Sequence, residues 1–259
     1  MSAGWSRFGA WALLAAGLLG WEFSVRALQL SALVLPPPSV VGATLWQGLR
    51  SGYLWPHIGQ TVLELLLGLT AGCALGLASG VLMGESATLR RLLMPYVVTS
   101  QVVPKLALAP LFIVWFGFGM TSTVVITALI CFFPLMENTM TGIAQVDARR
   151  LELFRMLGAT RWQTLLRLKI PAGLPSILAG FRVAVVLALV GAVVGEFIGG
   201  SKGLGALIIA SQGMMDTALM FAVLVLITLL GLGLYQLAIS LEKRLLQSRL
   251  TTLQKEIEK

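Results

Sequence analysis

Six long apolar runs dominate this chain and restrict it to one class of fold. An α-helix rises about 1.5 Å per residue, so roughly 20 residues cross a hydrocarbon layer about 30 Å thick. Hydrophobic residues make up 57% of the 259 residues and charged residues only 12%, whereas a soluble domain carries about 25% charged residues. Lipid must cover the surplus apolar surface, so the sequence predicts an all-α integral membrane protein with about six transmembrane helices. The predicted spans are residues 8–28, 58–84, 92–116, 119–140, 174–198 and 217–241.

The positions of lysine and arginine predict the orientation of these spans. If the N-terminus lies in the cytoplasm, fourteen basic residues fall in inner segments, and only Arg26, Arg50 and Lys202 fall in outer ones. Membrane proteins concentrate basic residues in their cytoplasmic loops. We therefore expect both termini on the cytoplasmic side of a bacterial inner membrane. The run 8–28 is longer than the roughly 7–15-residue core of a signal peptide, and we interpret it as a retained first helix.

The composition also excludes several functions. The net charge of +8 follows from basic residues spread over inner loops, which argues against a nucleic-acid partner. The phosphate-binding pattern GxxxxGK[ST] is absent, and His57 is the only histidine, so nucleotide, metal and histidine-based catalytic sites lack their usual residues. Cys73 and Cys131 fall in separate spans and are interpreted as inert thiols. We expect no catalytic residues, no metal and no cofactor.

Two further patterns concern the outer segment and helix packing. Residues 29–57 include three consecutive prolines followed by a short amphipathic helix, for which Ser39 is a suitable N-cap. In the second span, glycine recurs at every fourth position, which places a smooth stripe on one helix face where another helix can pack closely. The glycines of this stripe are Gly68, Gly72, Gly76, Gly80 and Gly84.

The segment 146–171 is a charged, amphipathic stretch between two apolar spans. Asp147 is a suitable cap for a first short helix, and Gly158 follows at the position where helices end in a left-handed residue. Thr160 and Gln163 have the spacing of a capping box, which begins a second helix. Pro171 is expected to end that helix. The segment is therefore predicted to form helix, glycine turn and helix at the inner membrane surface, as a docking surface or as an anchor on anionic lipid.

These same residues resemble a known loop. Glu152, Gly158 and the ending Leu168-Lys169-Ile170-Pro171 resemble the EAA loop of binding-protein-dependent ABC importer permeases. The pattern of that loop is Glu-Ala-Ala, three residues, Gly, nine residues, then Ile-x-Leu-Pro. The spacing agrees at every step, with Leu153 and Phe154 in place of the two alanines.

The resemblance extends over roughly residues 60–245 and implies a type I ABC importer permease-like bundle. The stretches 104–122 and 195–222 resemble the nitrate/sulfonate/taurine branch, which also includes permeases for thiamine-pyrimidine and riboflavin-type compounds. By resemblance, the loop inserts into a cleft of a separate cytoplasmic ATP-binding cassette ATPase subunit, and an extracytoplasmic solute-binding protein delivers the solute. The implied ATPase-coupling residues are Glu152, Arg155, Gly158, Ala159, Trp162 and Pro171.

On this basis the chain divides into three parts. Residues 1–57 hold the first transmembrane helix and the outer amphipathic segment. Residues 58–245 form the core permease domain with about five helices and the coupling loop 141–173. Residues 246–259 form a cytoplasmic tail. Six spans make a cramped pathway for one chain, so a homodimer embedded in lipid is expected.

Charged residues within the spans require partners or a function. An ion pair between Glu137 and Arg182 is the simplest structural expectation. Lys105 follows Pro104, where unwound backbone can line a cavity, so Lys105 is the candidate to meet an anionic solute. Glu196 is a second candidate for the translocation path.

The expected function is transport without catalysis by this chain. We expect the chain to be a permease subunit of an ATP-driven importer for a small, anionic solute such as a sulfonate, taurine or nitrate. Two alternatives remain: the same importer class carrying a thiamine-pyrimidine or riboflavin-like compound, or a self-contained secondary transporter that uses its buried carboxylates for ion coupling.

Overall fold

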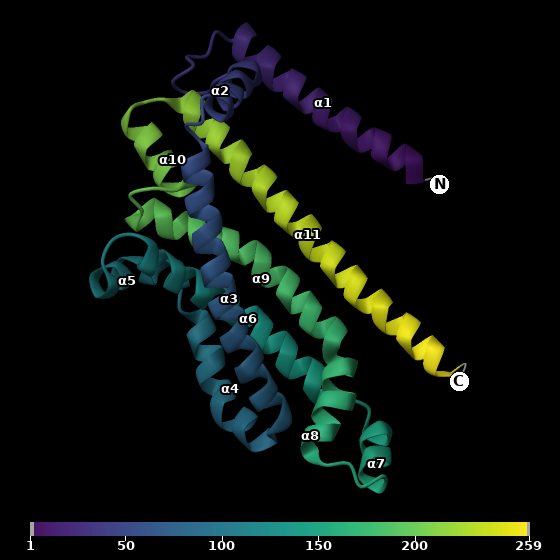
Figure 1. Cartoon of the computed structure of the whole chain (residues 1–259). Helices are drawn as coiled ribbons and strands as arrows, with labels where there is room; N and C mark the ends of the chain where they lie inside the picture. The colour runs from purple at the N-terminus through teal and green to yellow at the C-terminus, as the bar shows by residue number, and fades with distance from the viewer. Residues whose placement is uncertain (1–2, 258–259) are drawn as a thin grey trace.

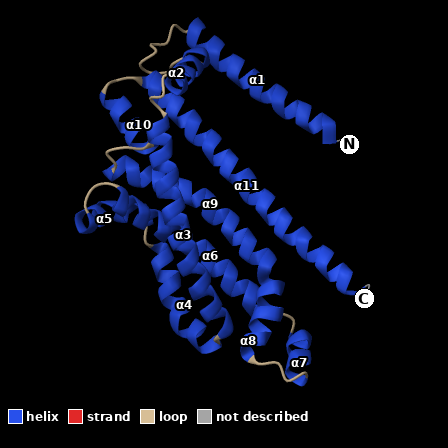
Figure 2. Ribbon diagram, in the orientation of Figure 1, coloured by secondary structure: helices blue, strands red, loops and turns tan. Residues whose placement is uncertain are grey.

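The computed structural model describes residues 3–257, and Figure 2 shows helices and loops but no strand in that range. The helices in chain order are α1 (Ala3–Ala27), α2 (Pro38–Arg50), α3 (Trp55–Glu85), α4 (Ala87–Val102), the 3-10 helix η1 (Lys105–Leu108), α5 (Ala109–Phe116), α6 (Met120–Ala144), α7 (Ala148–Met156), α8 (Arg161–Thr164), the π-helical segment η2 (Leu165–Lys169), α9 (Ile170–Gly199), α10 (Leu204–Gly213) and α11 (Thr217–Ile257).

Four helical stretches of the described residues are long and apolar enough to cross a membrane. They are residues 55–85, 120–144, 161–199 and 217–247. The pair formed by α4 and the segment Lys105–Phe116 passes the same test as a fifth candidate, bent by 80°. The all-α membrane architecture expected from the sequence is therefore confirmed.

The third predicted span is wrong as a straight crossing. The run 92–116 divides into α4, η1 and α5, with an extended residue, Val103, immediately before Pro104. Proline disfavours helical geometry in the residue that precedes it and lacks the N–H needed to continue a helix. The apolar composition of the run therefore did not predict the sharp change in helix direction at Pro104.

Three long helices form the centre of the molecule. Figure 1 shows α3, α6 and α9 side by side, and α6 packs extensively against both of the other two. Their shared core includes Leu65 of α3, Leu135 of α6 and Ala188 of α9, each at most 1% exposed. α10 and α11 pack against α9 from the other side.

The glycine stripe of α3 faces α6. A Cβ added at Gly72 would lie 2.5 Å from the Ala128 carbonyl oxygen, and one at Gly80 would lie 2.7 Å from the Met136 carbonyl oxygen. From the opposite side, a Cβ at Gly191 of α9 would lie 2.9 Å from Thr127 Cα. At these glycines, α3 and α9 thus both approach the α6 backbone more closely than they could if the positions carried a side chain.

α1 lies apart from this centre and joins it through α2. Figure 1 shows α1 diverging from the bundle. Glu22 accepts hydrogen bonds from the Ser39 N–H (3.0 Å) and the Ser39 hydroxyl (2.8 Å), and it pairs with Arg26. Ser39 is therefore not the N-cap of α2, as the sequence suggested, because Pro37 occupies that position and the Ser39 side chain bonds to α1.

The C-terminal helix is longer than the sixth predicted span. α11 continues as one helix from Thr217 to Ile257, so most of the segment 246–259, expected to be a separate tail, is helical. Residues 258 and 259 lie outside the described range.

The close packing of α3 on α6 predicts a large difference between two glycines of α3. Gly72→Ala should destabilise the protein by about 1–3 kcal/mol, because the added methyl group collides with the Ala128 carbonyl. Gly59→Ala is the matched control: nothing lies within 4 Å of its Cβ position, and alanine favours the helix by up to about 1 kcal/mol. Thermal unfolding of the detergent-purified protein measures both. Equal midpoints for the two variants would contradict the packing described here.

Candidate coupling loop and membrane cavity

The first helix of the loop 146–171 is closed at both ends by local hydrogen bonds. The Asp147 carboxylate accepts from the Arg149 N–H at 3.0 Å. At the other end, Gly158 adopts a φ of 71°, its N–H donates to the Arg155 carbonyl, and the Ala159 N–H donates to the Phe154 carbonyl. This pair of bonds is the Schellman arrangement, which ends a helix and turns the chain.

The second helix begins at a complete capping box. The Thr160 N–H donates to Gln163 Oε1 at 2.8 Å, and the Gln163 N–H donates to Thr160 Oγ1 at 3.2 Å. Together these bonds satisfy two donors that a helix start leaves free. The helix–glycine turn–helix arrangement expected from the sequence is therefore present.

Pro171 does not end this second helix, contrary to the expectation. α8 runs through η2 into α9, so one helical body extends from Arg161 to Gly199. The Ile170 N–H donates to the Leu165 carbonyl, five residues back. A proline ring clashes with the carbonyl four residues before it, and the wider π turn accommodates that ring while the helix continues.

The residues assigned to ATPase coupling lie on or near the surface of this loop. Glu152, Arg155, Gly158 and Trp162 are exposed, and Ala159 and Pro171 are half-buried. Within the part of the chain that the structure describes, Glu152 makes no hydrogen bond or ion pair, including none to its neighbours on α7.

Exposed apolar side chains lie among these residues in the loop, and the sequence did not predict their exposure. Met156 is 75% exposed and Leu157 is 73% exposed, beside the exposed Leu153. Exposed apolar side chains grouped at a loop tip are typical of a protein-binding surface. The sequence did not distinguish these exposed side chains from buried ones, because apolar residues are common throughout this chain.

A long-range ion pair ties the loop to α3. Lys169 Nζ lies 2.7 Å from Glu85 Oε1, and both side chains are largely buried. The two residues border a cavity of about 740 Å³ that Arg155 and Arg161 also line. The loop is thus connected to the transmembrane helices through α9 and also through the inner end of α3.

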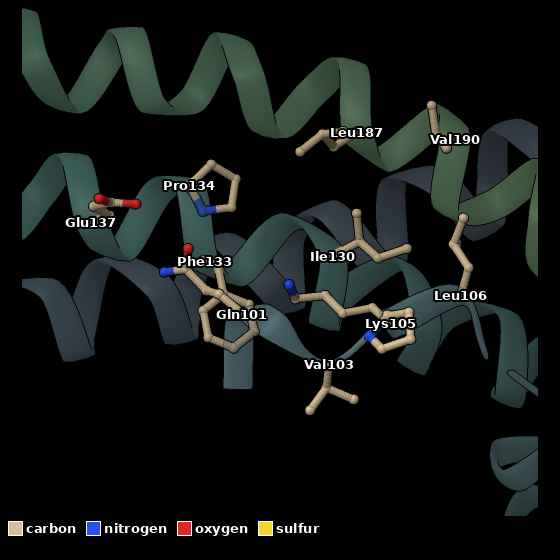
Figure 3. A pocket seen from close by; sticks show the side chains of 11 residues that line it. Gln101, Val103, Lys105, Leu106, Ile130, Phe133, Pro134, Glu137, Leu187 and Val190 are labelled. Atoms are coloured by element: carbon tan, nitrogen blue, oxygen red, sulfur yellow. The ribbon is translucent and has the colours of Figure 1, made fainter. Parts of the chain in front are cut away.

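A second cavity opens at the bend between α4 and η1, within the predicted membrane region. It has a volume of about 430 Å³ and is lined by apolar residues of α6 and α9 together with Gln101, Lys105 and Glu137. Figure 3 shows Lys105 extending toward the Phe133 ring. Its ammonium group lies 4.5 Å from the ring centroid, within the range of a cation–π contact.

The side chains of Gln101, Lys105 and Glu137 make no hydrogen bond or ion pair with any other described residue. The expected ion pair between Glu137 and Arg182 is wrong, because Arg182 Nη1 bonds instead to Glu242 Oε2 of α11 at 3.2 Å. The unwound backbone expected at Lys105 is confined to Val103 and Pro104, because Lys105 itself begins the 3-10 helix η1. The presence of Glu137 and Gln101 at the same cavity was not anticipated.

Glu196, the second candidate for the path, lies elsewhere. It is 1% exposed near the C-terminal end of α9 and accepts a 2.7 Å hydrogen bond from the Gly205 N–H. It does not line the cavity at Lys105. His57 is half-buried in the same region, with Nδ1 3.0 Å from the Gly203 carbonyl oxygen.

The described residues give no sign of a metal centre. No three histidine, cysteine, aspartate or glutamate side chains among them are placed to hold a metal ion. Cys73 and Cys131 are buried free thiols.

Comparison with known proteins identifies the family. Residues 68–247 match the model of the binding-protein-dependent transport system inner membrane component family. The chain is 39% identical to a riboflavin transport system permease protein of Chloroflexus aurantiacus over 243 residues, which cover 94% of this chain and 91% of that protein. It is 33% identical to the taurine transport system permease protein of Escherichia coli over 251 residues, which cover 95% and 89%.

The fold agrees with solved structures. A structure of an inward-facing methionine ABC transporter superimposes with a TM-score of 0.65 at 19% identity, covering 74% of this chain and 97% of that chain. The chain therefore belongs to the binding-protein-dependent transport system inner membrane component family, and it is a non-catalytic, multi-pass permease subunit of an ATP-driven importer.

Proposed function

We propose that the cavity at Lys105 is part of the path of a small, anionic solute. The observation that carries the proposal is that the side chains of Gln101, Lys105 and Glu137 face this cavity with no hydrogen-bond or ion-pair partner among the described residues. A charged side chain in a membrane is costly unless it meets a partner or water, so this face borders a polar path instead of lipid. The Lys105 ammonium supplies the attraction for an anion.

The relatives widen the choice of solute. Their names include aliphatic sulfonates, taurine, formylaminopyrimidine and riboflavin. Sulfonate, taurine and nitrate fit an ammonium group most directly, and a thiamine-pyrimidine or riboflavin-like compound is the alternative, favoured by the Phe133 ring in the same cavity. A self-contained secondary transporter is disfavoured by the family of this chain, whose members work with separate ATPase and solute-binding proteins.

The coupling loop is proposed to dock into a cleft on the cytoplasmic ATPase subunit. Glu152 and Gly158 would make the contact, aided by Arg155, Ala159 and Trp162, because this surface is exposed and its carboxylate is unpaired. Pro171 lies inside the helical body that would transmit ATP-driven movement to the path. A homodimer with both termini in the cytoplasm, in contact with lipid through α1 and α11, completes the proposed arrangement.

The docking proposal predicts the outcome of a substitution at Gly158. Aspartate tolerates positive φ, and nothing in this chain lies within 4 Å of the Gly158 Cβ position. Gly158→Asp should therefore leave the permease folded and reduce the ATPase that co-purifies with it by about tenfold or more, equivalent to about 1.4 kcal/mol of binding.

Gly52→Asp is the matched control for this experiment. Gly52 also has a positive φ, 84°, and an open Cβ position, but it lies on the opposite, outer side of the chain. It should leave ATPase association unchanged. An intact complex carrying Gly158→Asp would refute docking through this turn.

The path proposal predicts a specific loss at Lys105. Lys105→Ala should lower solute uptake by about tenfold, because the cavity loses its only cation among the described lining residues. Uptake of labelled taurine, an alkanesulfonate, nitrate and a pyrimidine by cells expressing the complete importer measures the effect. Lys202→Ala, which removes an exposed outer cation, is the control. Normal uptake by Lys105→Ala over a range of solute concentrations would remove Lys105 from the path.

A further inference from the structure

Two carboxyl groups are buried together near the outer end of the bundle, away from the Lys105 cavity. Glu64 of α3 is 2% exposed and Glu196 of α9 is 1% exposed. Each side chain is held from one side only. Gln60 Nε2 donates to Glu64 Oε1 at 2.7 Å, and the Gly205 N–H donates to Glu196 Oε2 at 2.7 Å.

The second oxygen of each carboxyl group lacks a hydrogen-bond partner. Glu64 Oε2 and Glu196 Oε1 are buried and find no donor in the described chain. The two side chains are neighbours, and the Thr61 and Thr123 hydroxyl groups lie beside them. The backbone supports this placement, because the Leu204 N–H donates to Thr61 Oγ1, one turn before Glu64 on α3.

No cation neutralises this pair. The ion pairs found among the described residues lie elsewhere. The other titratable groups at this end include His57, whose Nδ1 faces the backbone of Gly203, and Tyr53, whose ring packs on His57. Arg50, Lys202 and Asp216 are exposed at the same end. The outer half of α6 and the whole of α10 carry no charged residue, and α6 presents Thr123 to the pair.

Two adjacent carboxylates in such an environment cannot both stay ionised. Their repulsion is strong where water is excluded, and a pair of this kind retains one proton between its members. One protonated carboxyl group then donates to the other, which also satisfies both of the oxygens that lack a donor.

We propose that Glu64 and Glu196 form a proton-binding site in which one proton is shared between Glu64 Oε2 and Glu196 Oε1. The site joins α3 to α9, and through Gly205 it also holds α10. The backbone at Gly203 lies directly against the Glu196 carboxyl group, because a Cβ at Gly203 would overlap that group. The bound proton thus links the outer ends of α3, α9 and α10.

Infrared spectroscopy of the purified transporter complex tests the site directly. At neutral pH, the wild type should show the carbonyl band of a protonated carboxylic acid that exchanges slowly with deuterated solvent. The double substitution Glu64→Gln/Glu196→Gln should abolish that band, and Glu137→Gln, at the Lys105 cavity, should retain it. Absence of the band from the wild type, or its survival in the double variant, would overturn the proposal.

The pH dependence of stability gives a second test that does not depend on uptake. A proton held in the folded state but released in the unfolded state stabilises at low pH, and this stabilisation is lost as pH rises. The midpoint of thermal unfolding of the wild type should fall with rising pH relative to that of Glu64→Gln/Glu196→Gln, whose two amides bond at every pH. Parallel curves for the two proteins would contradict the shared proton.

Discussion

The rest of the structure depends on the contact that α6 makes with two glycine-bearing helices. Gly72 and Gly80 of α3 approach the carbonyl oxygens of α6, and Gly191 of α9 approaches Thr127 Cα from the other side. In a membrane, lipid tails are as apolar as leucine, so helices associate through close packing and hydrogen bonds instead of hydrophobic burial. This contact holds the coupling loop at one end of the bundle and the buried glutamates at the other.

The continuous helix from Arg161 to Gly199 joins these two ends. It begins at a capping box, and its other end carries Glu196. The π turn at Leu165–Lys169 lets it pass Pro171 without a break and brings Lys169 to Glu85 of α3. In the proposed mechanism, a push on the loop reaches α9 and α3 together, which are the two helices that pack most extensively on α6.

The parts that sequence reasoning predicted are those that depend on local or periodic patterns. The caps at Asp147, Gly158 and Thr160 involve residues at most a few positions apart, and the glycine stripe repeats with the helix period. The misses at Pro171 and Ser39 concern partners that only the assembled fold supplies. Pro171 looks like a helix end until a π turn is built before it, and Ser39 bonds to Glu22 of another helix. The sequence also did not predict that Gln101, Lys105 and Glu137 line one cavity, because their proximity follows from the bend at Pro104.

Distance measurements in the assembled transporter test the central claim, that the helix from Arg161 to Gly199 moves as one rigid lever. Spin labels at Gln163 and Ile198, both exposed, report its length, and the distance between Gln163 labels on the two copies of the proposed homodimer reports its movement. On ATP binding, the first distance should stay constant while the second shortens. A change in the distance between 163 and 198 would show that the helix bends at the π turn or at a proline, and would contradict the account.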